Sequence, residues 1–300
     1  GHSVIIIARG DRAHAVQRDG LRIKGLADFS AQVPVITDAS QFEAADILIV
    51  AMKTPGTEAA LERLRNARVG AALSIQNGLL KDELLTRTFG ADRVLGALAD
   101  TSGELLSSGE VLFTRNVNLP LGELTGGISE RARRIAGSID QAGVRATAVA
   151  DIVSLEWSKL TVWLGLVSMA VTLRCVSWRF LIDPDCAQLL VRLAREVAQV
   201  ARAHGVDLVD AASLPLREML DATETDAIEA VRHAGEQMRS RAPGHRMSAL
   251  QDLDAGRPLE VEETFGYAAR KARELGLSLP LLEACHQLVA AADRIRRAGT

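Results

Sequence analysis

The strongest constraint on the fold is a change of pattern near residue 150. Before it, short apolar runs alternate with amphipathic segments, which is the pattern of βα units around a mostly parallel sheet. After it, strand signals stop and apolar residues recur at helical spacing to the end of the sequence. The change predicts an α/β domain over residues 1–150 and an all-helical domain over residues 151–300.

The apolar runs also predict individual elements. The predicted strands are residues 4–8, 45–51, 71–75, 94–97 and 144–150, and alternating runs in residues 109–123 suggest an antiparallel hairpin or pair. The predicted helices include residues 57–65, 129–142 and 187–204. Residues 160–173 contain no charge, but this run is shorter than the ~20 residues that cross a bilayer. We expect a buried helix there.

Several functional classes are disfavoured by composition and spacing. The formal net charge is −3, and Lys and Arg are scattered along the chain, so nucleic acid is not an expected partner. The three cysteines form no CxxC pair and the six histidines no HExxH spacing, so no metal site is predicted. With neither a membrane span nor a secretory signal in the sequence, we expect a cytoplasmic protein.

The motif that best marks a dinucleotide-binding domain is absent from the sequence. Such a domain opens with a strand, a GxGxxG turn and a helix whose N-terminus holds the pyrophosphate, whereas this sequence begins GHSVIIIARGD. We expect residues 4–8 to be the second strand of a Rossmann-like domain, truncated by about 20 residues that hold the first strand and the glycine loop. The alternative is that residues 1–3 are a cloning remnant on a complete protein.

Two cations follow predicted strands. An acidic residue at the end of the second strand binds the ribose hydroxyls in NAD enzymes, whereas an arginine accommodates the 2′-phosphate of NADP. Arg9 occupies that place, and Lys53 follows the strand at residues 45–51, so NADP(H) is the predicted cofactor. Asp11 is a feature against this choice, and both cations could instead be ordinary solvated charges.

Five motifs occur together in order. They are IARGD at residues 7–11, AMKT at 51–54, QNGL at 76–79, EWSKL at 156–160 and SALQDLDAGRPLEVE at 248–262. In order and spacing this set resembles the ketopantoate reductase (2-dehydropantoate 2-reductase) family. The resemblance implies an NADPH-binding N-terminal domain, a helical C-terminal domain, and reduction of the ketone of a 2-oxo acid, by default ketopantoate to pantoate in pantothenate biosynthesis.

The resemblance also implies roles for single residues. Hydride arriving at a ketone leaves an alkoxide that a positioned acid must protonate, and Lys159 matches the family's catalytic lysine. Asn77 matches an asparagine near the nicotinamide and the lysine. Glu260 matches a glutamate that holds the lysine or binds substrate hydroxyl, so both residues are expected at the cofactor and catalytic sites. Ser248 matches a serine that binds the substrate carboxylate.

Each of these four residues also has a purely structural explanation. Lys159 could cover apolar surface with its stem, and Asn77 with Gly78 forms a strong turn signal. Glu260 could be a solvated acid near a helix start. Ser248 with Gln251 makes a capping box.

The sequence departs from the family at three polar positions. Asparagines expected four and eight residues after the lysine are Trp163 and Val167, and an asparagine expected three residues before the serine is His245. Trp163 and His245 are therefore candidate substrate contacts, although His245 could be an exposed loop residue. The departures favour a less polar 2-oxo acid or ketone as an alternative substrate, because lost hydrogen bonds weaken discrimination.

Two further possibilities concern the function and the partners of the protein. The missing glycine loop and the apolar replacements leave open a nucleotide-binding sensor without catalysis. Lys159→Ala distinguishes the two functions, because it abolishes turnover in an enzyme and spares pure binding. Besides the small 2-oxo acid, a second copy of the chain, forming a homodimer, is a partner to test.

Overall fold

The chain divides into two compact units. The structure, a computed structural model, describes residues 2–210 and 213–298. Unit 1 comprises residues 1–52, 56–76 and 81–152, and unit 2 comprises residues 53–55, 77–80 and 153–300. The last segment of unit 1 ends at Ile152, whereas the predicted domain boundary was residue 150. Two short segments from the first half of the sequence belong to the second unit, and both carry predicted site residues.

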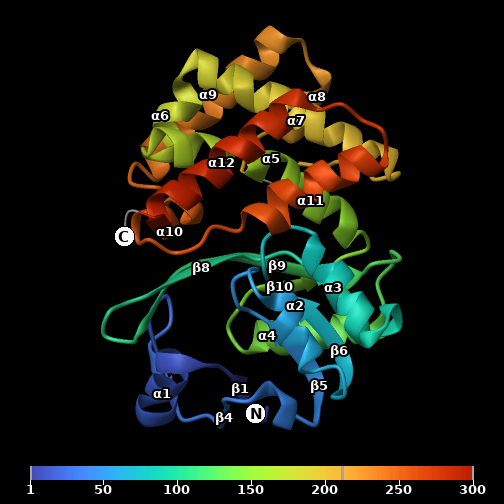
Figure 1. Cartoon of the computed structure of the whole chain (residues 1–300), viewed down its shortest axis with the longest axis vertical. Coiled ribbons are helices and arrows are strands. Elements are labelled where there is room, and N and C mark those ends of the chain that lie inside the picture. The colour runs from blue at the N-terminus through green and yellow to red at the C-terminus, as the bar shows by residue number, and fades with distance from the viewer. Residues whose placement is uncertain (1, 211–212, 299–300) are drawn as a thin grey trace. The chain divides into compact units, whose positions relative to one another are not determined.

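Unit 1 contains strands and four α-helices (Figure 1). Its strands are β1 (Ile6–Ile7), β2 (Leu21–Gly25), β3 (Phe29–Ala31), β4 (Val35–Ile36), β5 (Ala44–Val50), β6 (Arg68–Ser74), β7 (Val94–Ala97), β8 (Asp100–Leu105), β9 (Val111–Glu123) and β10 (Ala146–Ala148). Its helices are α1 (Gly10–Asp19), α2 (Thr57–Glu62), α3 (Leu80–Phe89), of which Leu80 lies in unit 2, and α4 (Glu130–Gln141). Short 3₁₀ turns lie at Ala39–Gln41 and Ala91–Arg93.

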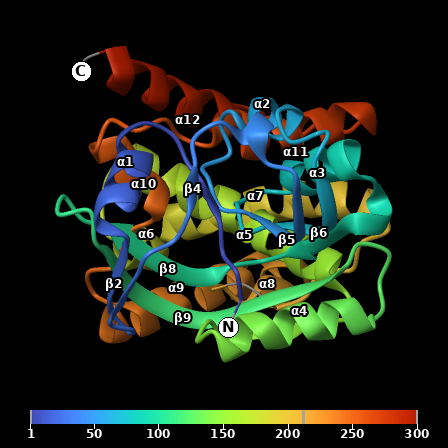
Figure 2. The same ribbon diagram turned by 90° about the horizontal axis from the view of Figure 1, so that it is seen from below.

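The main sheet of unit 1 has the order β3-β2-β9-β7-β6-β5, and β8 and β10 also pair with β9. Strands β5, β6 and β7 run parallel, and β9 runs antiparallel to β7. Figure 2 shows α4 on one side of this sheet and α2 and α3 on the other. A twisted, mostly parallel sheet with helices on both faces is the arrangement of a Rossmann-like domain, so the predicted fold class is confirmed for this unit.

The core of unit 1 explains why its central strands are continuous apolar runs. Leu73 of β6, Leu95 of β7 and Leu121 of β9 are all 0% exposed, and Ile135 of α4 packs in the same cluster. Strands covered by helices on both faces cannot alternate apolar and polar residues. This is why the sequence pattern predicted β6 and β7 well.

Two strands differ from their predictions. The hairpin predicted within residues 109–123 is instead one strand of 13 residues, β9, which pairs with β8 across a turn at Leu106–Glu110. The strand predicted at residues 4–8 spans only Ile6–Ile7, because its partner β4 pairs with just these two residues. The length of a strand depends on its partner, which a local pattern does not contain.

The regular secondary structure among the described residues of unit 2 is entirely helical. Its helices are α5 (Ile152–Leu173), which begins one residue inside unit 1, α6 (Ser177–Ile182), α7 (Pro184–Ala203), α8 (Leu216–Asp221), α9 (Glu224–Arg241), α10 (Ser248–Asp254), α11 (Val261–Glu274) and α12 (Pro280–Ala298). Helix α5 carries the apolar run of residues 160–173 and is buried along most of its length. A Cβ at Gly165 would lie 2.6 Å from Leu190 Cδ2, so glycine permits close packing of α5 against α7.

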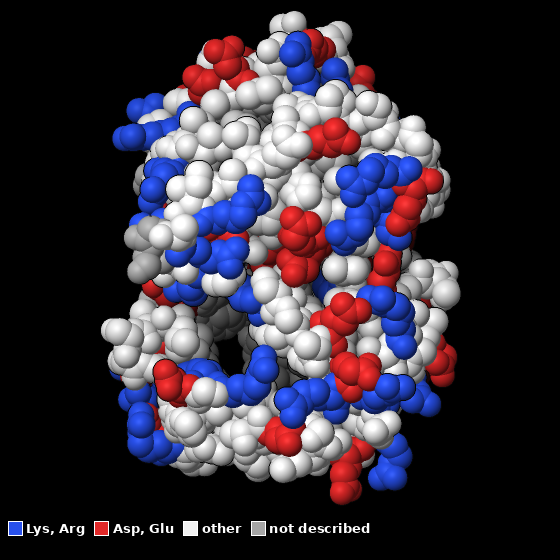
Figure 3. Space-filling model, in the orientation of Figure 1, with Lys and Arg blue, Asp and Glu red and all other residues white. Residues whose placement is uncertain are grey.

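In residues 2–210 and 213–298, no helix combines the length and apolar character that crossing a membrane requires. Basic and acidic side chains intermingle over the face drawn in Figure 3. The coloured residues on that face therefore form no extended field of one sign.

Candidate active site

Two predicted site residues follow the carboxyl ends of neighbouring parallel strands in the chain. Strand β5 ends at Val50 and β6 at Ser74, and residues 53–55 and 77–80 follow them into unit 2. Ligands of open α/β sheets bind outside the carboxyl ends of the strands. Lys53 and Asn77, two of the predicted site residues, lie in these segments.

The chain after these strands is fixed by a buried glutamine within unit 1. Gln76 Nε2 donates to Met52 O at 2.9 Å and to Thr57 Oγ1 at 2.7 Å. Its Oε1 accepts from Ser74 Oγ at 2.9 Å. The side chain thus holds the segments after β5 and β6 in register, a role that the QNGL motif did not reveal.

Glu260, immediately before α11, joins the two segments of unit 2. Its Oε1 accepts a hydrogen bond from Thr54 N at 3.1 Å, and its Oε2 accepts one from Asn77 Nδ2 at 3.1 Å. Its backbone oxygen accepts from Thr264 Oγ1. The structure therefore brings the predicted pair Asn77 and Glu260 into direct contact.

Asn77 lies in a bend of the chain, as its Asn-Gly sequence predicts. Gly78 has a φ of +80°, and a Cβ there would lie 3.1 Å from Glu263 O. Glycine is favoured at this φ, so Asn77 and Gly78 do form a turn. The same turn carries the Asn77 amide to Glu260.

Asp252 forms a second polar group beside Glu260. Its side chain is only 7% exposed, and it accepts from Lys53 Nζ at 2.6 Å and from Arg257 Nε at 2.7 Å. Two cations on one buried carboxylate leave a net positive charge, and a buried carboxylate needs such partners. Sequence reasoning missed Asp252 and Arg257, although both lie inside the quoted SALQDLDAGRPLEVE motif.

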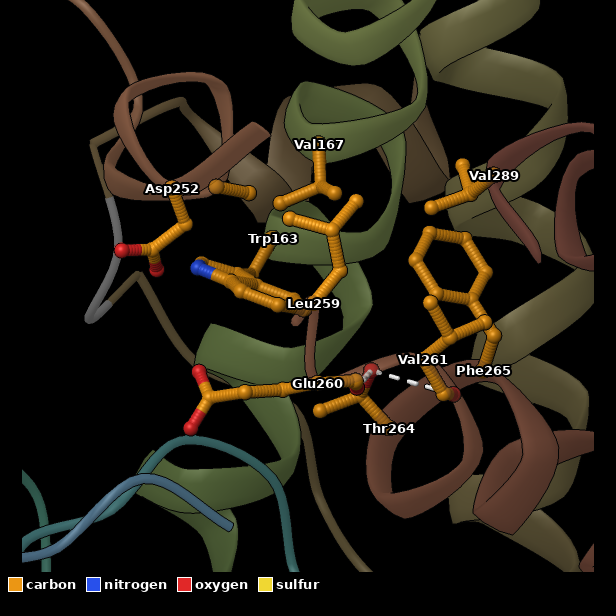
Figure 4. A pocket seen from close by; sticks show the side chains of 10 residues that line it. Trp163, Val167, Asp252, Leu259, Glu260, Val261, Thr264, Phe265 and Val289 are labelled. Atoms are coloured by element: carbon orange, nitrogen blue, oxygen red, sulfur yellow. Dashed lines mark hydrogen bonds between the residues drawn. The ribbon is translucent and has the colours of Figure 1, made fainter. Parts of the chain in front are cut away.

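A small pocket, partly open to solvent, adjoins these groups within unit 2 (Figure 4). Three of its lining residues are polar, Asp252, Glu260 and Thr264. The others are apolar: Trp163, Val167, Ala249, Leu259, Val261, Phe265 and Val289. Figure 4 shows the Trp163 indole between Val167 and the Glu260 carboxylate.

Lys159 lies on α5, one helical turn before Trp163. It is half-buried, and the neighbouring Glu156 is buried at 5% exposure. Residues four apart on a helix share a face, so Lys159, Trp163 and Val167 follow one another along the same side of α5. Lys159 itself is not among the residues that line the pocket.

The start of α11 concentrates negative charge. Burial raises the pKa of Glu263, and repulsion from Glu260 and Glu262 raises it further. His286 Nε2 lies 3.0 Å from Glu262 Oε1 and can offset part of this charge when protonated. The acidic character of this turn therefore belongs to a group of residues and not to Glu260 alone.

The predicted capping box at Ser248 is wrong. Met247 is the N-cap of α10 and has no side-chain capping bond, while Ser248 is the first helical residue and exposed. Gln251 Nε2 donates instead to Arg246 O at 3.2 Å. In the described structure the Ser248 hydroxyl is therefore not used for capping.

The last two predicted residues are not among those that line the pocket. His245 is exposed, its Nδ1 lies 2.9 Å from Ser177 Oγ, and its backbone oxygen accepts from Ser177 N at 2.9 Å. It therefore anchors the start of α6. Arg9 is exposed in unit 1, immediately before α1. Among the described residues, no cluster of His, Cys, Asp and Glu could hold a metal ion.

Two family profiles match the chain. "Ketopantoate reductase PanE/ApbA" matches residues 1–126, and "Ketopantoate reductase PanE/ApbA C terminal" matches residues 151–293. The chain belongs to the ketopantoate reductase family. The family resemblance inferred from the five motifs is thereby confirmed, and membership makes the protein an oxidoreductase.

Curated relatives carry the same name. The 2-dehydropantoate 2-reductase of Archaeoglobus fulgidus is 29% identical over 277 residues, which cover 92% of this chain and 85% of that protein. The 2-dehydropantoate 2-reductase of Mycobacterium tuberculosis is 31% identical over 253 residues, 83% of this chain and 76% of that protein. The match to ketopantoate reductases extends over most of both chains.

Solved structures share the fold. A PanE/ApbA family ketopantoate reductase from Ralstonia eutropha superposes with a TM-score of 0.82 at 22% identity, covering 99% of this chain and 92% of that one. A D-mandelate dehydrogenase solved with NADH and anilino(oxo)acetate gives 0.83 at 17% identity, with the same two coverages of 99% and 92%. A ketopantoate reductase from Staphylococcus aureus, described as dimeric, gives 0.71 at 20% identity, covering 98% of this chain and 100% of that one.

Proposed function

We propose that the protein reduces a 2-oxo acid to a 2-hydroxy acid with a nicotinamide dinucleotide, as the 2-dehydropantoate 2-reductases it is similar to do with 2-dehydropantoate. The observation that carries this proposal is the Glu260 carboxylate, which binds Asn77 and borders a pocket on the Lys159 face of α5. These are the polar groups that a ketone reduction needs in one place.

The residues present fit an anionic dinucleotide. Lys53 keeps 52% of its side chain exposed, and Arg257 already balances the charge of its partner Asp252. Arg9 is exposed after β1, where α1 begins, and a helix N-terminus also favours a phosphate. We propose NADPH as the form used, with Arg9 and Lys53 as its phosphate contacts, because guanidinium and ammonium groups bind phosphate well.

When bound, the reduced nicotinamide supplies a hydride to the ketone carbon. The negative charge then developing on the ketone oxygen must be met by a proton, and we assign its donation to Lys159 Nζ, which water reprotonates afterwards. Asn77 and Glu260 position the reacting groups. The Ser248 hydroxyl, which is not used for capping, binds the substrate carboxylate. His245, in the loop before α10, is a second contact to the substrate.

Substitution of the proton donor tests this assignment. Lys159→Ala is expected to lower kcat for 2-dehydropantoate by roughly 10²- to 10⁴-fold, the usual contribution of a general acid. Dinucleotide affinity, measured by fluorescence titration, should change little. Lys24→Ala, at an exposed lysine on β2, is the matched control. Unchanged turnover in Lys159→Ala would remove Lys159 from the mechanism, and dinucleotide binding without turnover by the unmutated protein would favour a sensor.

We also propose that the protein forms a homodimer through α12. Leu288 and Ile295 lie seven residues apart on this helix, 58% and 73% exposed. Two copies of α12 packed antiparallel would cover the apolar residues of both helices.

A further inference from the structure

We propose that the site prefers 2-oxo acids with a purely apolar side chain over acids whose side chain carries a hydroxyl. The proposal rests on the reductase function proposed above, since it concerns which acid the same site takes. Its basis is the composition of the pocket wall beside the reacting groups.

The position of the wall follows from α5. A helix rises 1.5 Å per residue, so Trp163 stands about 6 Å along the axis from Lys159, and Val167 about 6 Å further. An acid that takes its proton from Lys159 and extends along this face of α5 meets Trp163 first, with Val167 behind it in the same pocket wall.

The wall offers contact and almost no hydrogen bonding. Val167 is 2% exposed, Phe265 1% and Val289 1%, and all three face the same pocket as Trp163. The one side-chain donor among the apolar lining residues is the indole N–H of Trp163. Figure 4 shows this nitrogen on the side of the ring nearer Asp252, away from Val289 and Phe265.

The polar lining groups are already bonded within the protein. Each oxygen of Asp252 accepts a hydrogen bond, from Lys53 and from Arg257. Each oxygen of Glu260 does so as well, from Thr54 N and from Asn77, and Thr264 Oγ1 donates to the Glu260 backbone. A substrate hydroxyl would give up its hydration at this wall, and among the lining side chains only the remaining lone pairs of the two carboxylates and the indole N–H could replace it.

A matched pair of acids tests the preference. 2-Dehydropantoate is 4-hydroxy-3,3-dimethyl-2-oxobutanoate, and 3,3-dimethyl-2-oxobutanoate differs from it only by the absent hydroxyl. An apolar wall rejects an added hydroxyl by a factor of at most about 10², whereas a site built to bind the hydroxyl rejects the acid without it by roughly 10⁴ or more. We expect kcat/KM, measured by dinucleotide oxidation, to be roughly 10- to 100-fold higher for 3,3-dimethyl-2-oxobutanoate.

A buried hydroxyl introduced into the wall should shift this ratio. Val167→Thr adds a hydroxyl at nearly constant volume, and we expect it to move the kcat/KM ratio about tenfold toward 2-dehydropantoate. Val171→Thr is the control, because Val171 is also 2% exposed on α5 but does not line the pocket. It should leave the ratio unchanged while showing what a buried hydroxyl on this helix does to folding.

The outcomes separate the two proposals. If 2-dehydropantoate is reduced at least as efficiently as the hydroxyl-free acid, the reductase function stands and the apolar preference is wrong. If neither acid is reduced, the reductase function fails and the preference falls with it. The comparison of acids uses the unmutated protein, so it remains decisive even where Val167→Thr does not fold.

Discussion

The Glu260 carboxylate combines two tasks in one side chain. It binds the backbone N–H of Thr54 and the amide of Asn77, so it stabilises the segments that follow β5 and β6. The same carboxylate borders the pocket. Glu260 therefore has both a structural and a chemical role. Substitutions that keep or remove its hydrogen bonds can distinguish the two.

Glu260→Ala and Glu260→Gln should differ in stability and agree in activity. Alanine leaves Thr54 N and the Asn77 amide without their acceptor, which is expected to lower the free energy of unfolding by about 1–3 kcal/mol. Glutamine keeps an oxygen that accepts from Thr54 N, and its Nε2 can donate to Asn77 Oδ1 once the Asn77 amide is flipped. Urea titrations should therefore show a smaller loss of unfolding free energy for Glu260→Gln than for Glu260→Ala.

Turnover assays complete this comparison. Both variants should lose activity, because both lack the negative charge of the carboxylate. Glu262→Gln, at the exposed neighbour that pairs with His286, is the control for charge removal nearby. Wild-type kcat/KM in Glu260→Gln would mean that Glu260 acts only as a structural bridge.

Some site residues could be predicted from the sequence and others could not. Lys159 and Trp163 share a helix face by simple periodicity, so their neighbourhood was accessible to pattern reasoning. Asp252 was not, because one of its two cations, Lys53, is 199 residues away in sequence. A tertiary ion pair leaves no local pattern, which is why the second polar group of the site became visible only in the structure.

The helix starts show where local rules succeed. The sequence predicted a helix at residues 129–142, and α4 has Ser129 as its N-cap, with the Ser129 hydroxyl accepting from Ala132 N at 3.1 Å. Ser129 also donates to Glu123, whose pKa Arg131 holds below its ordinary value through bonds of 2.6 and 2.8 Å. At α10 the same kind of signal, Ser248 with Gln251, failed, because Met247 takes the N-cap position there.

Removing the N-cap of α4 should lower the stability of the protein and leave its activity unchanged. Ser129→Ala is expected to lower the free energy of unfolding by about 0.5–2 kcal/mol, the range found for N-cap serines. Ser138→Ala, on the same helix, is the matched control: its hydroxyl bonds back to Arg134 O at 3.0 Å, a contact that does little for a helix. Equal unfolding midpoints for the two variants would contradict the capping role of Ser129.

At the scale of the whole molecule, the sequence pattern assigned every residue before position 151 to one domain. The structure instead groups residues 53–55 and 77–80 with the helical unit. The cause is side-chain bonding to Asp252 and Glu260, which lie about 200 residues later. Chain order alone therefore gives the fold class but not the unit to which these two segments belong.

The exposed residues of α12 lead to a prediction about assembly. Ile295 is 73% exposed and Leu288 58%, and covering both in a symmetric contact removes apolar surface from water twice. We expect the protein to sediment as a dimer and Leu288→Glu with Ile295→Glu to sediment as a monomer, since four carboxylates would then face one another. Leu173→Glu changes a leucine that is 47% exposed at the end of α5 and should leave the dimer intact. A dimer that survives the double substitution would place the contact elsewhere, and a monomeric unmutated protein would exclude it.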